Sequence, residues 1–293
     1  MGDFARIWIP ASRPKTLPAA VAPVLMGTAI AAGDGVLHVG AAVAALLGAI
    51  LIQIGTNFAN DYFDFVKGTD TEERIGPQRA TAAGLVAPAT MRNAFLLVFG
   101  LAVLLGIYLV WRAGWPIVWI GLASVACGIL YTGGPKPLAY VGLGDVFVIV
   151  FFGPVATGGT YFVQALQWSE ASLIAGFGPG LIATGLLTVN NLRDIEGDAK
   201  AGKRTLAVRF GSTFAKTEYV VCLLGAAAVP IVLHLAFDAP IGVLAASAAC
   251  LVGIPPLKQV LAWTPGTPLL TALAATGRLL VVYALAFCIG WLV

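Results

Sequence analysis

Apolar segments of about 20 residues follow one another along most of this sequence, and few charges interrupt them. Only 11% of the residues are charged, whereas soluble globular proteins carry about 25%. Backbone polar groups find no water inside a bilayer, so a segment that crosses it must form a helix of about 20 residues. The sequence therefore predicts an all-α integral membrane protein, with residues 1–293 forming a single domain.

Hydropathy predicts nine transmembrane helices. Their expected bounds are 17–33, 40–65, 89–110, 115–131, 144–166, 172–192, 214–235, 238–257 and 271–292. The eighth helix contains Pro255 and Pro256, which are expected to kink it or to end it.

Basic residues fall almost entirely on one side of these predicted spans. If the spans alternate in direction, the loops on the opposite side contain only Arg112 as a basic residue. The positive-inside rule then predicts a cytoplasmic N-terminus and an outer C-terminus in a cell membrane. The long charged loops after the second and sixth spans share the cytoplasmic side, so we expect the functional site there.

Two acidic clusters end the second and the sixth predicted spans. Their members are Asn57, Asp61 and Asp64 in the first cluster, and Asn190, Asp194 and Asp198 in the second. The spacings i, i+4, i+7 and i, i+4, i+8 each place three side chains on one helix face. The chain thus resembles a weak duplication, with an Asn-x-x-x-Asp element at the end of each span.

Carboxylates crowded beside a membrane repel one another and need a cation. Oxygen ligands without His or Cys nearby suit Mg²⁺, which binds through a few carboxylates together with substrate phosphates. Bases that would suit the same anion are interleaved with the acids: Lys67, Arg74, Arg79, Lys200 and Lys203. This combination indicates a diphosphate site. The alternative, that both clusters are solvated helix ends, is weakened by their matched spacing on one side.

The two clusters and three further segments resemble one known family. "NFANDYFDFVKGTD" and "NNLRDIEGDAKAGKRTLAVRFG" look like the two Asp-rich motifs of the UbiA superfamily of intramembrane prenyltransferases. "ASRPKTLPAAVAPVLMGTA", "RIGPQRATAAGLV" and "YTGGPKPLAYVGLGD" resemble its MenA branch, which prenylates 1,4-dihydroxy-2-naphthoate, more than its 4-hydroxybenzoate branch.

The resemblance implies nine helices around a central cavity that the Asp-rich motifs cap on the cytoplasmic side. It also implies Mg²⁺-dependent transfer, with two ions expected, of a polyprenyl group from its diphosphate to 1,4-dihydroxy-2-naphthoate. The carboxylate is lost during alkylation, which gives demethylmenaquinone for menaquinone synthesis. The expected partners are therefore polyprenyl diphosphate, the naphthoate and the lipid bilayer, and no nucleic acid.

The charge pattern and the resemblance together suggest roles for individual residues. Metal binding is expected for Asp61, Asp64, Asp70, Asp194 and Asp198. Substrate binding is expected for Arg13, Asn57, Lys67, Arg74, Arg79, Asn190, Lys200 and Lys203. The expected catalytic residues are Lys15, Asn60, Tyr131 and Lys136. Asp145 stands where a Glu is expected after "GLG", and its role is left open.

Two alternatives remain open at this point. The protein could be a prenyltransferase with another acceptor, such as 4-hydroxybenzoate or a chlorin. It could also be an ion-coupled secondary transporter, although transporters place their acids near the midplane of the bilayer rather than at one interface. Aromatic residues, among them Phe147 and Phe151, are candidates for stabilising a carbocation in an enzyme, although packing explains most such residues.

Overall fold

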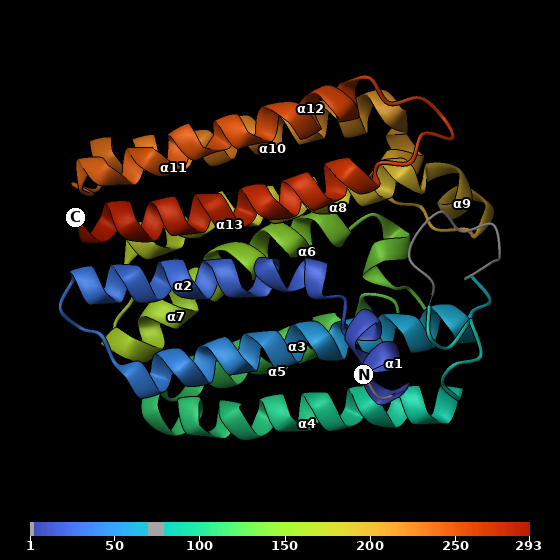
Figure 1. Ribbon diagram of the computed structural model, residues 1–293. Coiled ribbons are helices and arrows are strands. Elements are labelled where there is room, and N and C mark those ends of the chain that lie inside the picture. The colour runs from blue at the N-terminus through green and yellow to red at the C-terminus, as the bar shows by residue number, and fades with distance from the viewer. Residues whose placement is uncertain (1–2, 70–78) are drawn as a thin grey trace.

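The computed structural model describes residues 3–69 and 79–293, and every regular element within these ranges is helical. The long helices lie side by side along one direction and form a bundle (Figure 1). The predicted all-α fold is therefore confirmed.

The N-terminal half contains α1 (Asp3–Ser12), η1 (Pro14–Thr16), α2 (Leu17–Gly33), α3 (Val39–Val66), α4 (Pro88–Ala113), α5 (Trp115–Leu130) and η2 (Leu138–Val141). The middle contains α6 (Gly144–Val150), η3 (Phe151–Val155), α7 (Ala156–Ala165), α8 (Glu170–Arg193) and α9 (Ile195–Lys200). The C-terminal part contains α10 (Leu206–Ala236), η4 (Ile241–Val243), α11 (Leu244–Ala249), η5 (Cys250–Gly253), α12 (Ile254–Leu261) and α13 (Leu270–Leu292).

Eight helices among the described residues are long and apolar enough to cross a membrane, one fewer than predicted. The difference lies in α5, which is apolar but has only 16 residues. At 1.5 Å per residue such a helix is about 24 Å long, less than the ~30 Å of the hydrocarbon layer. The other predicted spans correspond to helices of sufficient length.

Two boundaries in the C-terminal part differ from the prediction. α10 begins at Leu206, where the side chain of Thr205 caps it, but Gly211 (φ 83°, ψ 174°) is non-helical and interrupts it, so the unbroken stretch begins after Gly211, close to the predicted residue 214. Pro255 and Pro256 do not end the eighth span but lie in the first turn of α12. Proline is tolerated there because the first N–H groups of a helix have no partner within it.

A close approach of two backbones holds α8 against the bend between α6 and α7. Gly153 (φ −121°, ψ −115°) and Pro154 interrupt the helix at this bend, within the π-helical segment η3. A Cβ atom on Gly176 of α8 would lie 2.6 Å from the carbonyl carbon of Gly153 and 2.6 Å from the nitrogen of Pro154. The contact between α8 and the bend therefore requires glycine at position 176.

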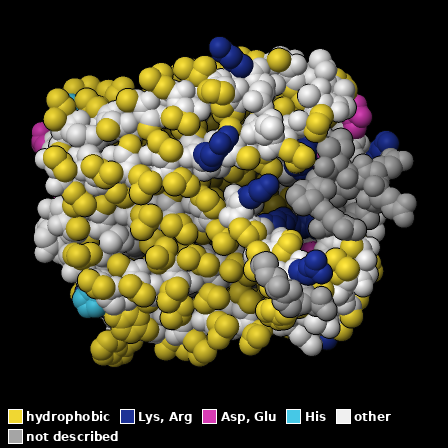
Figure 2. Space-filling view, viewed as in Figure 1, with side chains coloured by type: hydrophobic (Ala, Val, Ile, Leu, Met, Phe, Trp, Pro, Cys, Tyr) yellow, Lys and Arg dark blue, Asp and Glu magenta, His cyan; other side chains and the backbone are white. Residues whose placement is uncertain are grey.

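The surface of the bundle reflects its membrane environment. Figure 2 shows hydrophobic side chains over most of the flank, while several Lys and Arg side chains surround a hollow in the right half of the view. Apolar side chains that are more than half exposed occur along α4 and α5, including Leu104, Trp111 and Trp119. Such a flank suits lipid rather than water.

Replacing Gly176 by Ala should destabilise the protein by about 1–3 kcal/mol, because the added methyl group forces the two backbones apart. A lower thermal unfolding midpoint of the detergent-purified protein would show this. Gly100→Ala is the matched control, since Gly100 is exposed on α4 and a Cβ there would meet no atom within 4 Å. Equal midpoints for the two variants would contradict the close approach.

Candidate functional site

A single cavity of about 1560 Å³ brings the two acidic clusters together. The predicted site residues that line it are Arg13, Lys15, Asn57, Asn60, Asp61, Asp64, Arg79, Tyr131, Asn190, Asp194, Asp198, Lys200 and Lys203. Lys67 and Lys136 do not line it. Asp70 and Arg74 lie outside the described residues.

α3 explains why carboxylates follow an apolar run of sequence. The helix has 28 residues and is therefore about 42 Å long, which exceeds the hydrocarbon thickness of ~30 Å. Its N-terminus is capped by His38, whose Nδ1 accepts a hydrogen bond of 3.1 Å from the N–H of Ala41. Because α3 is about 12 Å longer than the hydrocarbon layer is thick, its last turns, which carry Asp61 and Asp64, can extend beyond that layer without a break in the helix.

Asp64 joins the two motifs. Its Oδ2 lies 2.9 Å from Nη2 of Arg79, and its Oδ1 lies 3.4 Å from Nζ of Lys203, which follows α9. The hydroxyl of Tyr140 also donates to Oδ1, at 3.2 Å. The side chain of Asp64 is only 1% exposed, and a buried carboxylate needs such partners to remain charged.

Asp61 makes a different set of contacts. Its two carboxylate oxygens accept hydrogen bonds from the backbone N–H groups of Ala80 (3.0 Å) and Thr81 (3.1 Å). This carboxylate therefore anchors the segment that returns to the site at residue 79. Its role as a metal ligand stays a prediction.

The second motif is organised by Arg193, which sequence reasoning counted only as a positive charge in a loop. Its Nε and Nη2 donate to the two oxygens of Asp194 at 2.7 and 2.6 Å, and Nη2 also donates to Oδ1 of Asn190 at 2.7 Å. The fork of a guanidinium matches a carboxylate in this way. Its side chain is 2% exposed, and it lines the cavity.

A loop after α5 closes one side of the site. Lys67 donates to the carbonyl oxygens of Thr132 (2.5 Å) and Gly134 (3.3 Å), and Thr132 Oγ1 donates to Oδ1 of Asn60 at 2.7 Å. Lys67 thus holds the loop instead of facing the cavity, and burial lowers its pKa. Its ammonium also lies 4.7 Å from the ring centre of Tyr140, a residue that sequence reasoning missed.

The remaining predicted residues divide by position. Tyr131 lines the cavity. Lys136 is exposed. Asp145 is buried and does not line the cavity.

The acids do not form a complete metal cage. Within residues 3–69 and 79–293, no three Asp, Glu, His or Cys side chains lie close enough to hold an ion by themselves. Mg²⁺, however, usually binds through one or two carboxylates and takes its other ligands from phosphate and water. Asp64, Asp194 and Asp198, which line one cavity together with several bases, fit an ion that is shared with a diphosphate.

Comparison with known proteins gives consistent results. The model of the UbiA prenyltransferase family matches residues 20–263. The chain is 38% identical to 1,4-dihydroxy-2-naphthoate octaprenyltransferase from Mycobacterium tuberculosis over 98% of this chain and 96% of that protein. The Escherichia coli protein of the same name is 41% identical over 74% of this chain and 72% of its own length.

The fold is also known from experiment. The structure of a UbiA homolog from Archaeoglobus fulgidus bound to GPP and Mg²⁺ matches with a TM-score of 0.67 at 15% identity, over 99% of each chain. At this sequence identity the structural match establishes only that the two proteins share a fold. The matches in sequence extend over most of the chain, and they establish that it belongs to the UbiA prenyltransferase family.

Proposed function

We propose that this protein transfers a polyprenyl group from polyprenyl diphosphate to 1,4-dihydroxy-2-naphthoate. The observation that carries the proposal is the single cavity, which joins two acidic motifs and their bases to an apolar interior. An allylic diphosphate has the same division between a charged head and an apolar tail. The names of the M. tuberculosis and E. coli relatives support the naphthoate as acceptor. Membership of a prenyltransferase family argues against the transporter alternative.

The charged end of the cavity suits a diphosphate. Arg79, Arg193, Lys200 and Lys203 line it, and their charges would stabilise the negative charge that develops on the leaving group. Asp64, Asp194 and Asp198 would hold divalent metal, and we propose two ions, one at each motif. A bound Mg²⁺ supplies further charge stabilisation at the diphosphate oxygens. The related UbiA homolog structure with GPP and Mg²⁺ supports this choice of metal.

The reaction balances without a further reactant. The allylic C–O bond breaks and its electrons leave with the diphosphate, while the ring carbon that carries the carboxylate bonds to the allylic carbon. The carboxylate then leaves as CO₂, and the electron pair of its bond restores the aromatic ring. Phe147 and Phe151 line the cavity, and aromatic faces stabilise cationic carbon. The apolar walls keep out water, which would otherwise capture the cation.

We further propose that residues 1–293 act as one domain in the cell membrane, with the N-terminus and the site on the cytoplasmic side. The support is the distribution of basic residues along the chain.

Purified protein in lipid vesicles should alkylate 1,4-dihydroxy-2-naphthoate only when a polyprenyl diphosphate and Mg²⁺ are both present. Chelation should stop the reaction, and added Mg²⁺ should restore it. Product and CO₂ release can be followed by chromatography and with a carboxyl-labelled acceptor. Offering 4-hydroxybenzoate in parallel tests the acceptor, and faster transfer to that compound would overturn the naphthoate assignment.

Asp194→Asn and Asp61→Asn should each lower both activity and stability. Asp194 pairs with the buried guanidinium of Arg193, so Asp194→Asn should lower kcat by about 100-fold or more and should destabilise the protein by leaving that guanidinium without its full charge partner. Asp61→Asn removes one of two acceptors for backbone N–H groups, so it should lower the unfolding free energy by about 1–3 kcal/mol. Activity and thermal midpoint are measured together. A wild-type midpoint for Asp61→Asn would contradict the anchoring role of Asp61.

A further inference from the structure

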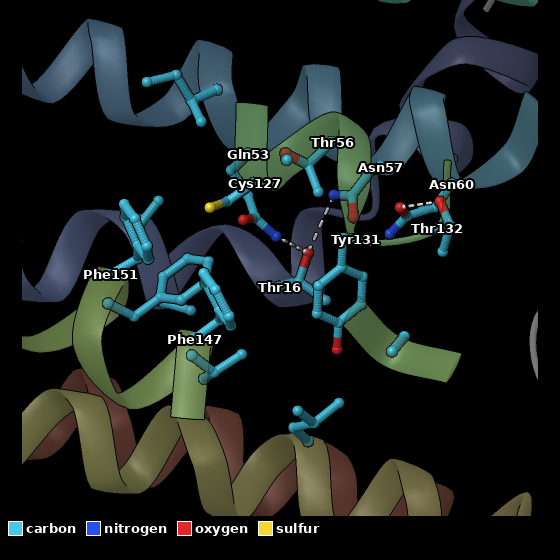
Figure 3. A pocket seen from close by; sticks show the side chains of 18 of the residues that line it. Thr16, Gln53, Thr56, Asn57, Asn60, Cys127, Tyr131, Thr132, Phe147 and Phe151 are labelled. Atoms are coloured by element: carbon cyan, nitrogen blue, oxygen red, sulfur yellow. Dashed lines mark hydrogen bonds between the residues drawn. The ribbon is translucent and has the colours of Figure 1, made fainter. Parts of the chain in front are cut away.

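Two amide side chains line the cavity next to the acidic cluster of α3. Gln53 and Asn57 are spaced i, i+4 on this helix, and Asp61 follows Asn57 by another four residues, so all three share one face. Gln53 and Asn57 are 9% and 3% exposed. Figure 3 shows both amides beside Thr16, at the edge of the cavity. Buried amides in an apolar setting need hydrogen-bond partners for their oxygen as well as for their nitrogen.

A chain of hydrogen bonds fixes the orientation of both amides. The hydroxyl of Thr16 donates to the carbonyl oxygen of Arg13 at 2.9 Å, so its oxygen can only accept from other groups. It accepts from Nε2 of Gln53 and from Nδ2 of Asn57, at 3.2 Å each. Nδ2 of Asn57 also donates to the carbonyl oxygen of Ser12 at 2.9 Å. With both nitrogens committed to this network, the two amide oxygens are left as free acceptors.

These oxygens have no donor within the part of the chain that the structure describes, although both residues line the cavity. A flat apolar wall faces them. Phe147 and Phe151 stack with their planes 5° apart and their centroids separated by 5.9 Å, and Figure 3 shows them across the cavity from Gln53, with Tyr131 beside them. The space between amides and rings therefore combines two acceptors with an aromatic surface.

We propose that the amide oxygens of Gln53 and Asn57 accept hydrogen bonds from the two ring hydroxyl groups of a para-dihydroxy aromatic acceptor, while Phe147 and Phe151 bind its face. This inference rests on the proposed function and identifies the acceptor subsite within it. Side chains at i and i+4 are about 5–6 Å apart at Cβ, a spacing that suits hydroxyl groups on opposite sides of one ring. The ring then lies one helical turn from Asp61, next to the charged end of the cavity.

The arrangement also explains how one acceptor can be selected over another. A monohydroxy acceptor such as 4-hydroxybenzoate offers one donor, so one buried amide oxygen would lose its partner. An unpaired buried polar group is costly, and sites built on such groups reject analogues that lack the matching one.

Gln53→Met tests the subsite, because it keeps the length of the side chain and removes the acceptor oxygen. We expect KM for 1,4-dihydroxy-2-naphthoate to rise by about 5- to 100-fold, while KM for the polyprenyl diphosphate changes by less than about twofold. Gln164→Met is the matched control, since Gln164 is buried but does not line the cavity. It should leave both KM values near those of the wild type.

A second readout separates binding from mere structural damage. The wild type should discriminate against the 1-methyl and 4-methyl ethers of the acceptor, which cannot donate from the modified oxygen. Gln53→Met should lose discrimination against one of the two ethers, whereas a purely steric effect would persist in the variant. If the wild type accepts both ethers as readily as the diol, water satisfies the amides and the inference fails although transfer itself is intact. If the wild type alkylates no dihydroxynaphthoate at all, the result contradicts the proposed function and therefore also the inference that rests on it.

Discussion

The buried charge of Asp64 is the constraint on which the site depends. A carboxylate that is 1% exposed loses its hydration, and close cations together with hydrogen-bond donors compensate for that loss. Arg79 and Lys203 provide the compensation from two separate parts of the chain. The electrostatics of one side chain therefore tie α3 to the segment that begins at residue 79 and to the loop after α9.

The pairing of Asp64 with Arg79 and Lys203 also places bases where an anion could bind. Asp64 pairs with Arg79 and Lys203, and Asp194 pairs with Arg193, so these acids and bases compensate one another at the edge of the cavity. A diphosphate with bound metal would bring its own negative and positive charges and could exchange partners with both sets. Binding would then replace these ion pairs by contacts to the diphosphate and its metal.

The sequence predicted the fold well because each helix depends on its own hydropathy and on the lack of water in a bilayer. It also predicted that Asp64 and Asp194 would share a site, because spacing along a helix fixes which side chains share a face. The sequence did not predict contacts between segments that lie far apart along the chain. Tyr140 reaches Asp64 across 76 positions in the sequence, and the backbone donors of Asp61 lie about 20 positions away. Arg193 could have been found, since a base between Asn190 and Asp194 has two acceptors within one helical turn.

The shortness of α5 has a consequence for the loop that follows it. α3 continues for 28 residues whereas α5 ends after 16, so no helix of their own positions the residues after Leu130 beside the end of α3. The ammonium of Lys67, bonded to the carbonyls of Thr132 and Gly134, and the bond from Thr132 to Asn60 hold them there instead. A shift of α3 along its axis would therefore carry this loop, and with it Tyr131, in the same direction.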